Sequence, residues 1–139
     1  MVSGYASRNA EEIRVIVAGT RTFEDYSFAK EHLDRIIRGL QEDNPTKKIV
    51  MITGDARGTD QTGNRYAYEH GYSLQKFPAK WKTYGKAAGP IRNAQMLKFA
   101  SCAHPVLVAF WDGKSRGTRN MIEIAKQADV SVYTVRYDI

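Results

Sequence analysis

The feature that most constrains the fold is a fivefold alternation between short apolar runs and segments with helical spacing. The apolar runs that predict buried strands cover residues 13–18, 49–53, 72–77, 106–111 and 130–137. The segments that predict helices cover residues 26–41, 59–70, a stretch from Pro90 through Phe99, and 117–128. Parallel strands need crossover connections, which helices usually supply. We therefore expect an α/β fold, a single Rossmann-like domain with a mostly parallel five-stranded sheet and helices on both faces.

The length agrees with one domain. A chain of 139 residues can bury enough surface for a single core without a disulfide or a metal. Residues 1–12 are polar and aperiodic, which predicts a flexible lead-in before a domain at 13–139. The basic, glycine-containing stretch at 79–89 predicts a loop.

Composition narrows the classes of protein further. No run approaches the ~18 apolar residues of a membrane span, so we expect no membrane partner. The one cysteine, Cys102, cannot form an internal disulfide or a CxxC metal site, which favours a cytoplasmic location. His32, His70 and His104 are too widely spaced to suggest ligands, and we expect no metal and no cofactor.

The positive charge is concentrated in the middle of the chain. The net charge is +6, and residues 57–119 hold eleven basic and three acidic side chains. Such a patch faces either phosphate or only solvent.

Three glycine-bearing loops follow predicted strands and should converge at one edge of the sheet. They are Gly19-Thr20-Arg21, Gly54–Asp60 and Asp112–Thr118. In open α/β sheets, ligands bind beyond the carboxyl ends of the strands, where the strand order reverses. The three loops are therefore the first candidates for a binding site.

The Gly54–Asp60 and Asp112–Thr118 loops both lead into a predicted helix. Free amides and the helix dipole favour an anion at such a point, and Lys114 and Arg116 add charge at the second. Each loop is also compatible with an ordinary turn. Asp60 can instead cap the helix or bind a ribose hydroxyl. Neither loop has the Gly-Lys-Ser/Thr or GxGxxG pattern of the common nucleotide-binding motifs.

Residues 80–93 combine aromatic and basic side chains. Trp81 or Tyr84 can stack on a base, and Lys80, Lys82 and Lys86 can meet phosphate; alternatively, the rings fill the core and the lysines are solvated. Arg92 follows Pro90 by two residues, so we expect it in the first turn of its helix, facing a cleft with few core contacts. The rival view makes it a structural residue paired with a buried carboxylate.

Taken together, these motifs resemble the YspA-type branch of the SLOG superfamily. The resemblance covers about residues 13–136, on the segments 15–21, 54–60, 77–81, 85–96 and 109–118. It implies a Rossmann-like fold that binds a nucleotide or a nucleotide-derived signal. The superfamily also contains the Lonely Guy phosphoribohydrolases and the DNA-processing protein DprA.

The resemblance to the Lonely Guy enzymes is uneven. Arg92 occupies a place similar to that of their catalytic arginine, which makes it the one weak catalytic candidate. Their catalytic glutamate corresponds to Met121, which cannot act as an acid or a base. Asp112-Gly113 also replaces their Pro-Gly-Gly start. N-glycosidic hydrolysis by that mechanism is therefore doubtful.

Our first hypothesis is a cytoplasmic module that senses or sequesters a nucleotide or a nucleotide-derived compound, for example an ADP-ribose-like compound. The alternatives are a phosphoribohydrolase-like enzyme that releases a base from a nucleoside monophosphate, and a single-stranded nucleic-acid binder, which we regard as the lesser possibility. Relatives are often dimers, and Met96, Phe99, Met121 and Ile124 are either an interface or core. The residues expected to bind the ligand are Gly19, Thr20, Arg21, Gly54, Ala56, Arg57, Gly58, Thr59, Asp60, Lys80, Trp81, Arg92, Asn93, Asp112, Gly113, Lys114, Ser115, Gly117 and Thr118.

Overall fold

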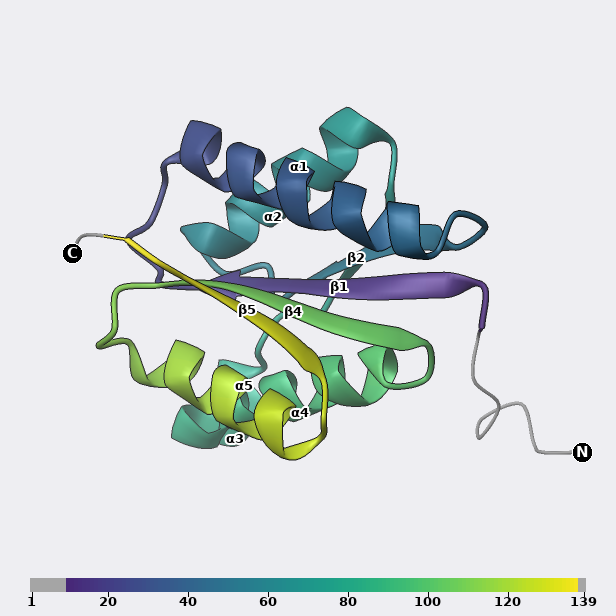
Figure 1. Ribbon diagram of the computed structural model, residues 1–139. Coiled ribbons are helices and arrows are strands. Elements are labelled where there is room, and N and C mark those ends of the chain that lie inside the picture. The colour runs from purple at the N-terminus through teal and green to yellow at the C-terminus, as the bar shows by residue number, and fades with distance from the viewer. Residues whose placement is uncertain (1–9, 138–139) are drawn as a thin grey trace, which may run out of the picture.

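A computed structural model describes residues 10–137 of the chain and shows a three-layer α/β sandwich (Figure 1). Its strands are β1 (Glu12–Gly19), β2 (Lys48–Thr53), β3 (Ser73–Lys76), β4 (His104–Trp111) and β5 (Ser131–Arg136). Its helices are α1 (Tyr26–Asp43), α2 (Thr59–His70), α3 (Trp81–Tyr84), α4 (Ala88–Ala100) and α5 (Arg116–Gln127), with a 3-10 turn, η1, at Gly85–Ala87. The predicted α/β fold is confirmed.

The sheet is parallel throughout and has the order β3-β2-β1-β4-β5. The chain first builds outward from β1 to β3 and then crosses back to place β4 on the other side of β1. The order therefore reverses between β1 and β4, the position at which α/β sheets bind ligands. The carboxyl ends of the strands lie at the left edge in Figure 1.

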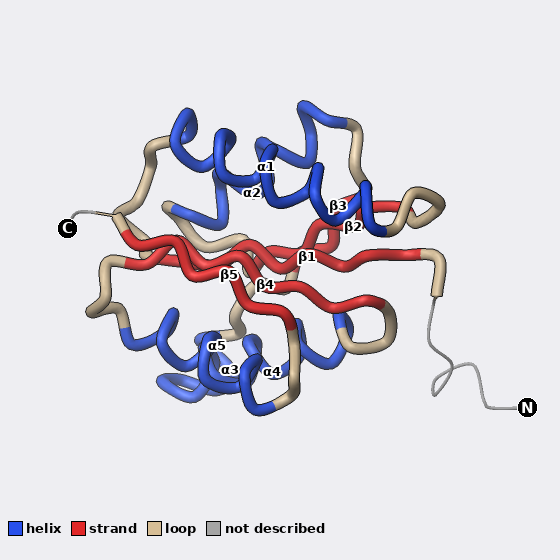
Figure 2. The backbone as a smooth tube through the Cα atoms, viewed as in Figure 1, coloured by secondary structure: helices blue, strands red, loops and turns tan. Residues whose placement is uncertain are grey.

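Helices cover both faces of the sheet, as Figure 2 shows: α1 and α2 on one face, and α3, α4 and α5 on the other. Alternate side chains of each central strand enter opposite cores, because neighbouring strand residues point to opposite faces. Val15 and Val17 pack towards α1 and α2, whereas Ile16 and Ala18 pack towards α4 and α5. Such continuous apolar runs are typical of a sheet buried on both faces.

Three boundaries differ from the sequence predictions. The first strand begins at Glu12, which pairs with Lys48, so it includes the last residue of the predicted lead-in at 1–12; residues 1–9 lie outside the described part. The predicted loop at 79–89 contains α3 and η1, because the amides of Thr83 and Tyr84 both donate to the Lys80 carbonyl. Helix α4 begins two residues before Pro90, which its free first-turn amides permit.

The methionines of α4 and α5 belong to the core. Met96 and Met121 are 2% and 1% exposed, and both pack in the cluster beneath β1 and β4. Phe99 and Ile124 are partly buried against the same cluster. Within residues 10–137, no helix combines the length and the apolar character that crossing a bilayer requires.

Candidate functional site

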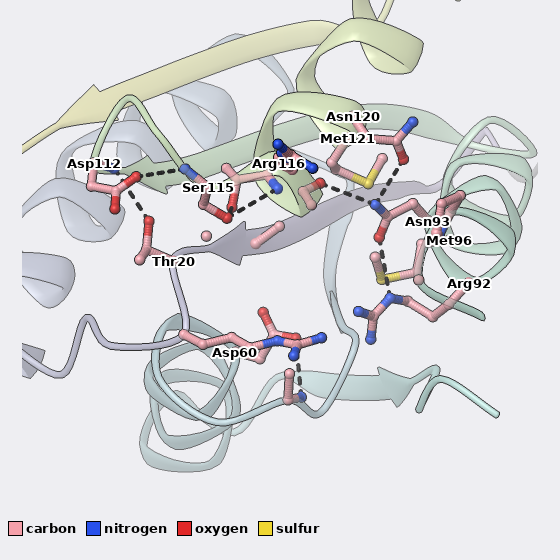
Figure 3. A pocket seen from close by; sticks show the side chains of 18 of the residues that line it. Thr20, Asp60, Arg92, Asn93, Met96, Asp112, Ser115, Arg116, Asn120 and Met121 are labelled. Atoms are coloured by element: carbon pink, nitrogen blue, oxygen red, sulfur yellow. Dashed lines mark hydrogen bonds between the residues drawn. The ribbon is translucent and has the colours of Figure 1, made fainter. Parts of the chain in front are cut away.

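A cleft of about 600 Å³ lies beyond the carboxyl ends of β1 and β4, between α2 and the α4–α5 layer (Figure 3). Its volume is in the range of small-molecule binding sites. The loop after β1, the loop after β4 and parts of α2, α3, α4 and α5 line it. The three loops that the sequence predicted to converge do contribute residues to this one cleft.

Thr20 holds these loops together. Its carbonyl accepts hydrogen bonds from the amide and the hydroxyl of Thr59, at 3.3 and 2.9 Å. Its amide donates to the Phe110 carbonyl at 3.0 Å, and its hydroxyl accepts from the Asp112 amide at 3.2 Å. The floor of the cleft is thus fixed by hydrogen bonds between loops that are distant in the sequence.

Glycine is needed where two of the loops meet. Gly58 has a φ of 78°, and a Cβ at this position would overlap with the backbone of Arg21. A Cβ at Gly19 would overlap with the Phe110 carbonyl oxygen. The two glycines therefore allow the loops after β1, β2 and β4 to approach closely.

Asp60 lies in the first turn of α2, and its carboxylate folds back onto its own loop. Oδ2 accepts a 3.1 Å hydrogen bond from the Ala56 amide, and the side chain is one of the few buried charged groups, at 6% exposure. Burial raises the pKa of Asp60 to about 6, although the Ala56 amide, Arg92 and Arg21 all act to lower it. Part of this predicted phosphate loop is therefore already bonded to a carboxylate of the protein.

Arg92 is buried in the second turn of α4, not exposed in the first turn as the spacing after Pro90 predicted, because α4 starts at Ala88. Nη1 donates to the carbonyl oxygens of Gly54 at 2.8 Å and Phe77 at 3.4 Å, and Nε donates to Asn93 Oδ1 at 3.1 Å. Burial lowers the pKa of Arg92, while the charge of Asp60 acts to raise it. The expectation that Arg92 makes few core contacts was wrong. The alternative, a structural residue paired with a buried carboxylate, is partly right, because Arg92 bonds to the backbone and the charge of Asp60 acts on it.

Asn93 connects α4 to α5. Its Nδ2 donates to the Gly117 carbonyl at 3.2 Å and to Asn120 Oδ1 at 3.0 Å, while Oδ1 accepts from Arg92 (Figure 3). Both amide hydrogens of the Asn93 side chain are thus used within the protein. Asn93 lines the cleft, but its bonds are those of a residue that positions its neighbours.

The loop after β4 is organised by Asp112. Its Oδ1 accepts from the amides of Lys114 at 2.8 Å and Ser115 at 2.9 Å, and these bonds hold the pKa of Asp112 below its usual value. Ser115 caps α5 by accepting from the Thr118 amide at 3.5 Å. The remaining amides of this first turn have no intrahelical acceptor and stand beside the cleft.

Three basic side chains border the cleft without an acidic partner. Arg21, Lys86 and Arg116 are exposed, and none forms an ion pair with a residue of the described segment 10–137. Arg21 lies over the ring of Trp81, with its Cζ 5.2 Å from the ring centroid. Trp81 is 47% exposed. The cleft is therefore positively charged on its open side and offers an aromatic surface.

Most, but not all, of the predicted binding residues lie at the cleft. Those that line it are Gly19, Thr20, Arg21, Ala56, Asp60, Trp81, Arg92, Asn93, Asp112, Ser115, Gly117 and Thr118. Those that do not are Gly54, Arg57, Gly58, Thr59, Lys80, Gly113 and Lys114. Gly54, Gly58 and Thr59 support lining residues from behind, as their contacts with Arg92, Arg21 and Thr20 show.

Several lining residues were absent from the predicted set, including Thr22, Lys86, Arg116 and Asn120. Arg116 and Lys86 had been noted only as sources of charge. Asn120 carries no motif signal, since its place depends on the packing of α5 against α4. Met121, which the resemblance aligns with the glutamate of the Lonely Guy enzymes, lines the cleft. Glu123 is exposed and does not line it.

No three His, Cys, Asp or Glu side chains gather in the part of the chain that the structure covers, residues 10–137. The polar groups at the cleft are two carboxylates, the guanidinium of Arg92, the three exposed cations and the α5 amides.

Comparisons with known proteins agree with this architecture. Residues 13–84 match the model of the YspA, cpYpsA-related SLOG family. The "Gene 61 protein" of Mycobacterium phage D29 is 30% identical over 128 residues, which cover 86% of this chain and 93% of that protein. No solved structure matches. The chain belongs to the YspA, cpYpsA-related SLOG family, and the predicted relationship is confirmed.

Proposed function

We propose that this protein binds a nucleotide or a nucleotide-derived compound in the cleft between β1 and β4, and thereby senses or sequesters it. The observation that carries the proposal is a cleft of about 600 Å³ at the reversal of strand order. It is bordered by Arg21, Lys86 and Arg116, none of which forms an ion pair within residues 10–137. Membership of the SLOG family supports a nucleotide-related ligand at the coarse level.

The phosphate of the ligand binds at the start of α5. The first-turn amides of this helix and its dipole favour an anion, and the guanidinium of Arg116 can grip phosphate oxygens through paired hydrogen bonds. The other predicted phosphate loop, Gly54–Asp60, is a poorer place for phosphate. The Asp60 carboxylate already accepts a hydrogen bond from the Ala56 amide of this loop and would repel an anion.

The base stacks against Trp81. The indole is half exposed and borders the cleft, and Arg21 lies over it. A purine or pyrimidine ring can pack against an indole or a guanidinium plane whatever its hydrogen-bonding edge. The stack therefore supplies affinity and leaves base identity to other contacts. The single cysteine favours a reducing compartment, and we propose the cytoplasm; self-association stays a prediction.

Titration calorimetry tests the proposal with a panel of nucleoside mono- and diphosphates, cyclic nucleotides and ADP-ribose. At least one is expected to bind, and Arg116→Ala should weaken that binding about tenfold or more. The matched control is Arg38→Ala, which removes an exposed arginine from α1 on the opposite face of the sheet. No binding across the panel, or equal losses in both variants, would contradict the proposal.

A second candidate function, release of a base from a nucleoside monophosphate, rests on Asp60. This residue is a buried carboxyl in the cleft, and its pKa is raised to about 6, which suits an acid–base group. Asp112 is bonded to its loop amides, and Glu123 lies away from the cleft. Chromatography of nucleoside monophosphates after long incubation with the protein decides this point. Free base that the wild type releases and Asp60→Asn does not release supports the enzymatic function. If the wild type releases no free base, the enzymatic function is excluded.

A further inference from the structure

The inner end of the cleft differs chemically from its open side. Asp60 and Arg92, at 6% and 8% exposure, are both buried and both line the cleft. Figure 3 shows both away from Ser115 and Asp112, and Arg92 Nη1 and Asp60 Oδ2 both lie within 3 Å of the point that a Cβ of Gly54 would occupy. The guanidinium of Arg92 is the buried cation at this end, and Arg21, one of the exposed cations, also acts electrostatically on both groups.

The Asp60 carboxylate keeps the capacity to accept further hydrogen bonds. It accepts from the Ala56 amide through Oδ2, and the Gly54 amide also stabilises its charged form. It forms no ion pair with any residue between 10 and 137. A carboxylate has about four acceptor positions on its two oxygens. A ligand group that donates a hydrogen bond can therefore bind to this carboxylate.

The Arg92 guanidinium keeps donors for the same ligand group. Its hydrogen bonds to the protein use only Nε and Nη1, so the two hydrogens of Nη2 have no acceptor within the described segment. The bonds to Gly54 and Phe77 fix the plane of the guanidinium, and Gly54 leaves it room because a Cβ there would overlap with it. The donors are therefore already oriented before a ligand arrives.

A fixed acceptor beside fixed donors matches a hydroxyl group, which donates one hydrogen bond and accepts others. We propose that Asp60 and Arg92 form a subsite for the ribose hydroxyls of the ligand, which fixes the ligand's direction in the cleft with the phosphate towards α5. This inference rests on the proposed function and deepens it, because it makes the protein selective for nucleotides that carry the 2′- and 3′-hydroxyls over those that lack both.

The raised pKa of Asp60 supports the assignment. A carboxyl whose charge is only partly compensated by its surroundings gains most from a neutral donor that solvates its anion. A hydroxyl supplies that hydrogen bond without adding a charge. Hydrogen bonds to charged groups also discriminate strongly, because the analogue without the hydroxyl leaves the buried group without its partner.

The test compares matched nucleotides by titration calorimetry at pH 7.5. The probes are the 5′-mono- and diphosphates of adenosine, guanosine, cytidine and uridine, each with its 2′,3′-dideoxy counterpart. For each ribonucleotide that binds, the dideoxy form should bind about tenfold more weakly or worse. Arg116→Ala should weaken both members of a pair by the same factor, and Asp60→Asn should narrow the gap between them.

The outcomes separate the subsite from the function on which it rests. Equal affinity for the two forms of a binding nucleotide leaves the proposed function in place and overturns the subsite, as does an unchanged gap in Asp60→Asn. Failure of these probes, and of the cyclic nucleotides and ADP-ribose of the first panel, to bind overturns both. If Asp60→Asn does not fold, the ratio between matched nucleotides in the wild type decides the question alone.

Discussion

The guanidinium of Arg92 occupies the space where a side chain of Gly54 would begin. Nη1 donates a 2.8 Å hydrogen bond to the Gly54 carbonyl oxygen, and a Cβ at Gly54 would overlap with the same guanidinium. The two residues are 38 positions apart and join the end of β2 to α4. Arg92, which resembles the catalytic arginine of the Lonely Guy enzymes, is therefore also part of the scaffold that shapes the cleft.

Arg92→Lys should lower the free energy of unfolding by about 1.5–3 kcal/mol, the range for hydrogen bonds to charged groups. An ammonium cannot reproduce the planar arrangement by which Arg92 reaches Gly54, Phe77 and Asn93. Urea unfolding measures the change, with Arg38→Lys on the exposed face of α1 as the control. An unfolding midpoint equal to that of the wild type would return Arg92 to a role in ligand binding alone.

Gly54→Ala should destabilise the protein by about 1–3 kcal/mol, as overpacking of a fixed site does. The added methyl group must displace the guanidinium of Arg92 and break its bond to the Gly54 carbonyl. Gly39→Ala is the matched comparison, because Gly39 lies in α1 with nothing within 4 Å of the new Cβ. That change should stabilise the protein by about 0.5–1 kcal/mol. Thermal unfolding measures both changes, and melting temperatures that shift in the same direction in the two variants would contradict this explanation.

Asn93→Ala should cost more than Asn120→Ala. Asn93 is 5% exposed and makes three hydrogen bonds, so its loss leaves buried groups without partners, at about 1–3 kcal/mol. Asn120 contributes one of those bonds, and its loss should cost less than about 1 kcal/mol. The double variant measures the coupling between them, which we expect to exceed about 0.5 kcal/mol. Additive losses would mean that the bond between the two amides does not contribute to stability.

The fold could be predicted because it depends on local patterns. The apolar runs at 13–18 and 106–111 are buried on both faces, which leaves no polar alternation and requires helices on each side. The glycine-bearing loops after these strands also pointed to the correct edge of the sheet, because parallel strands all end there. The residues of α3 were misread as loop because four residues are too few for a helical period to be recognised.

The roles within the cleft depend on contacts that spacing does not encode. The position of Arg92 in α4 suggested exposure, yet its acceptors come from residues 54 and 77. Asn120 lines the cleft because α5 packs against α4, where its Oδ1 accepts a hydrogen bond from Asn93. Local sequence therefore indicated which residues gather at the cleft, whereas their hydrogen-bond partners required the packing of distant elements.

Asp60 should make the protein less stable as the pH rises from 4 to 7. Its pKa is about 6 in the folded protein against a usual value of 3.8, so between these values the folded state holds a proton that the unfolded state has lost. The stability that this proton contributes is complete below about pH 3.8 and disappears as the pH rises through about 6. The difference of about two pKa units corresponds to roughly 3 kcal/mol.

Asp60→Asn isolates this effect, because the amide does not titrate and can still accept from the Ala56 amide. Asp34 and Asp112, whose pKa values are lowered, make both proteins less stable at acid pH. Their contribution is the same in the two proteins, so it cancels in the comparison. Arg92 and Arg21 are the cations that act on Asp60, and both are present in the two proteins. Urea unfolding at pH 4.5, 5.5, 6.5 and 7.5 should show the variant gaining stability relative to the wild type as the pH rises. Parallel curves would mean that Asp60 keeps an ordinary pKa in the folded protein, and that Arg92, Arg21 and the Ala56 amide together offset the cost of its burial.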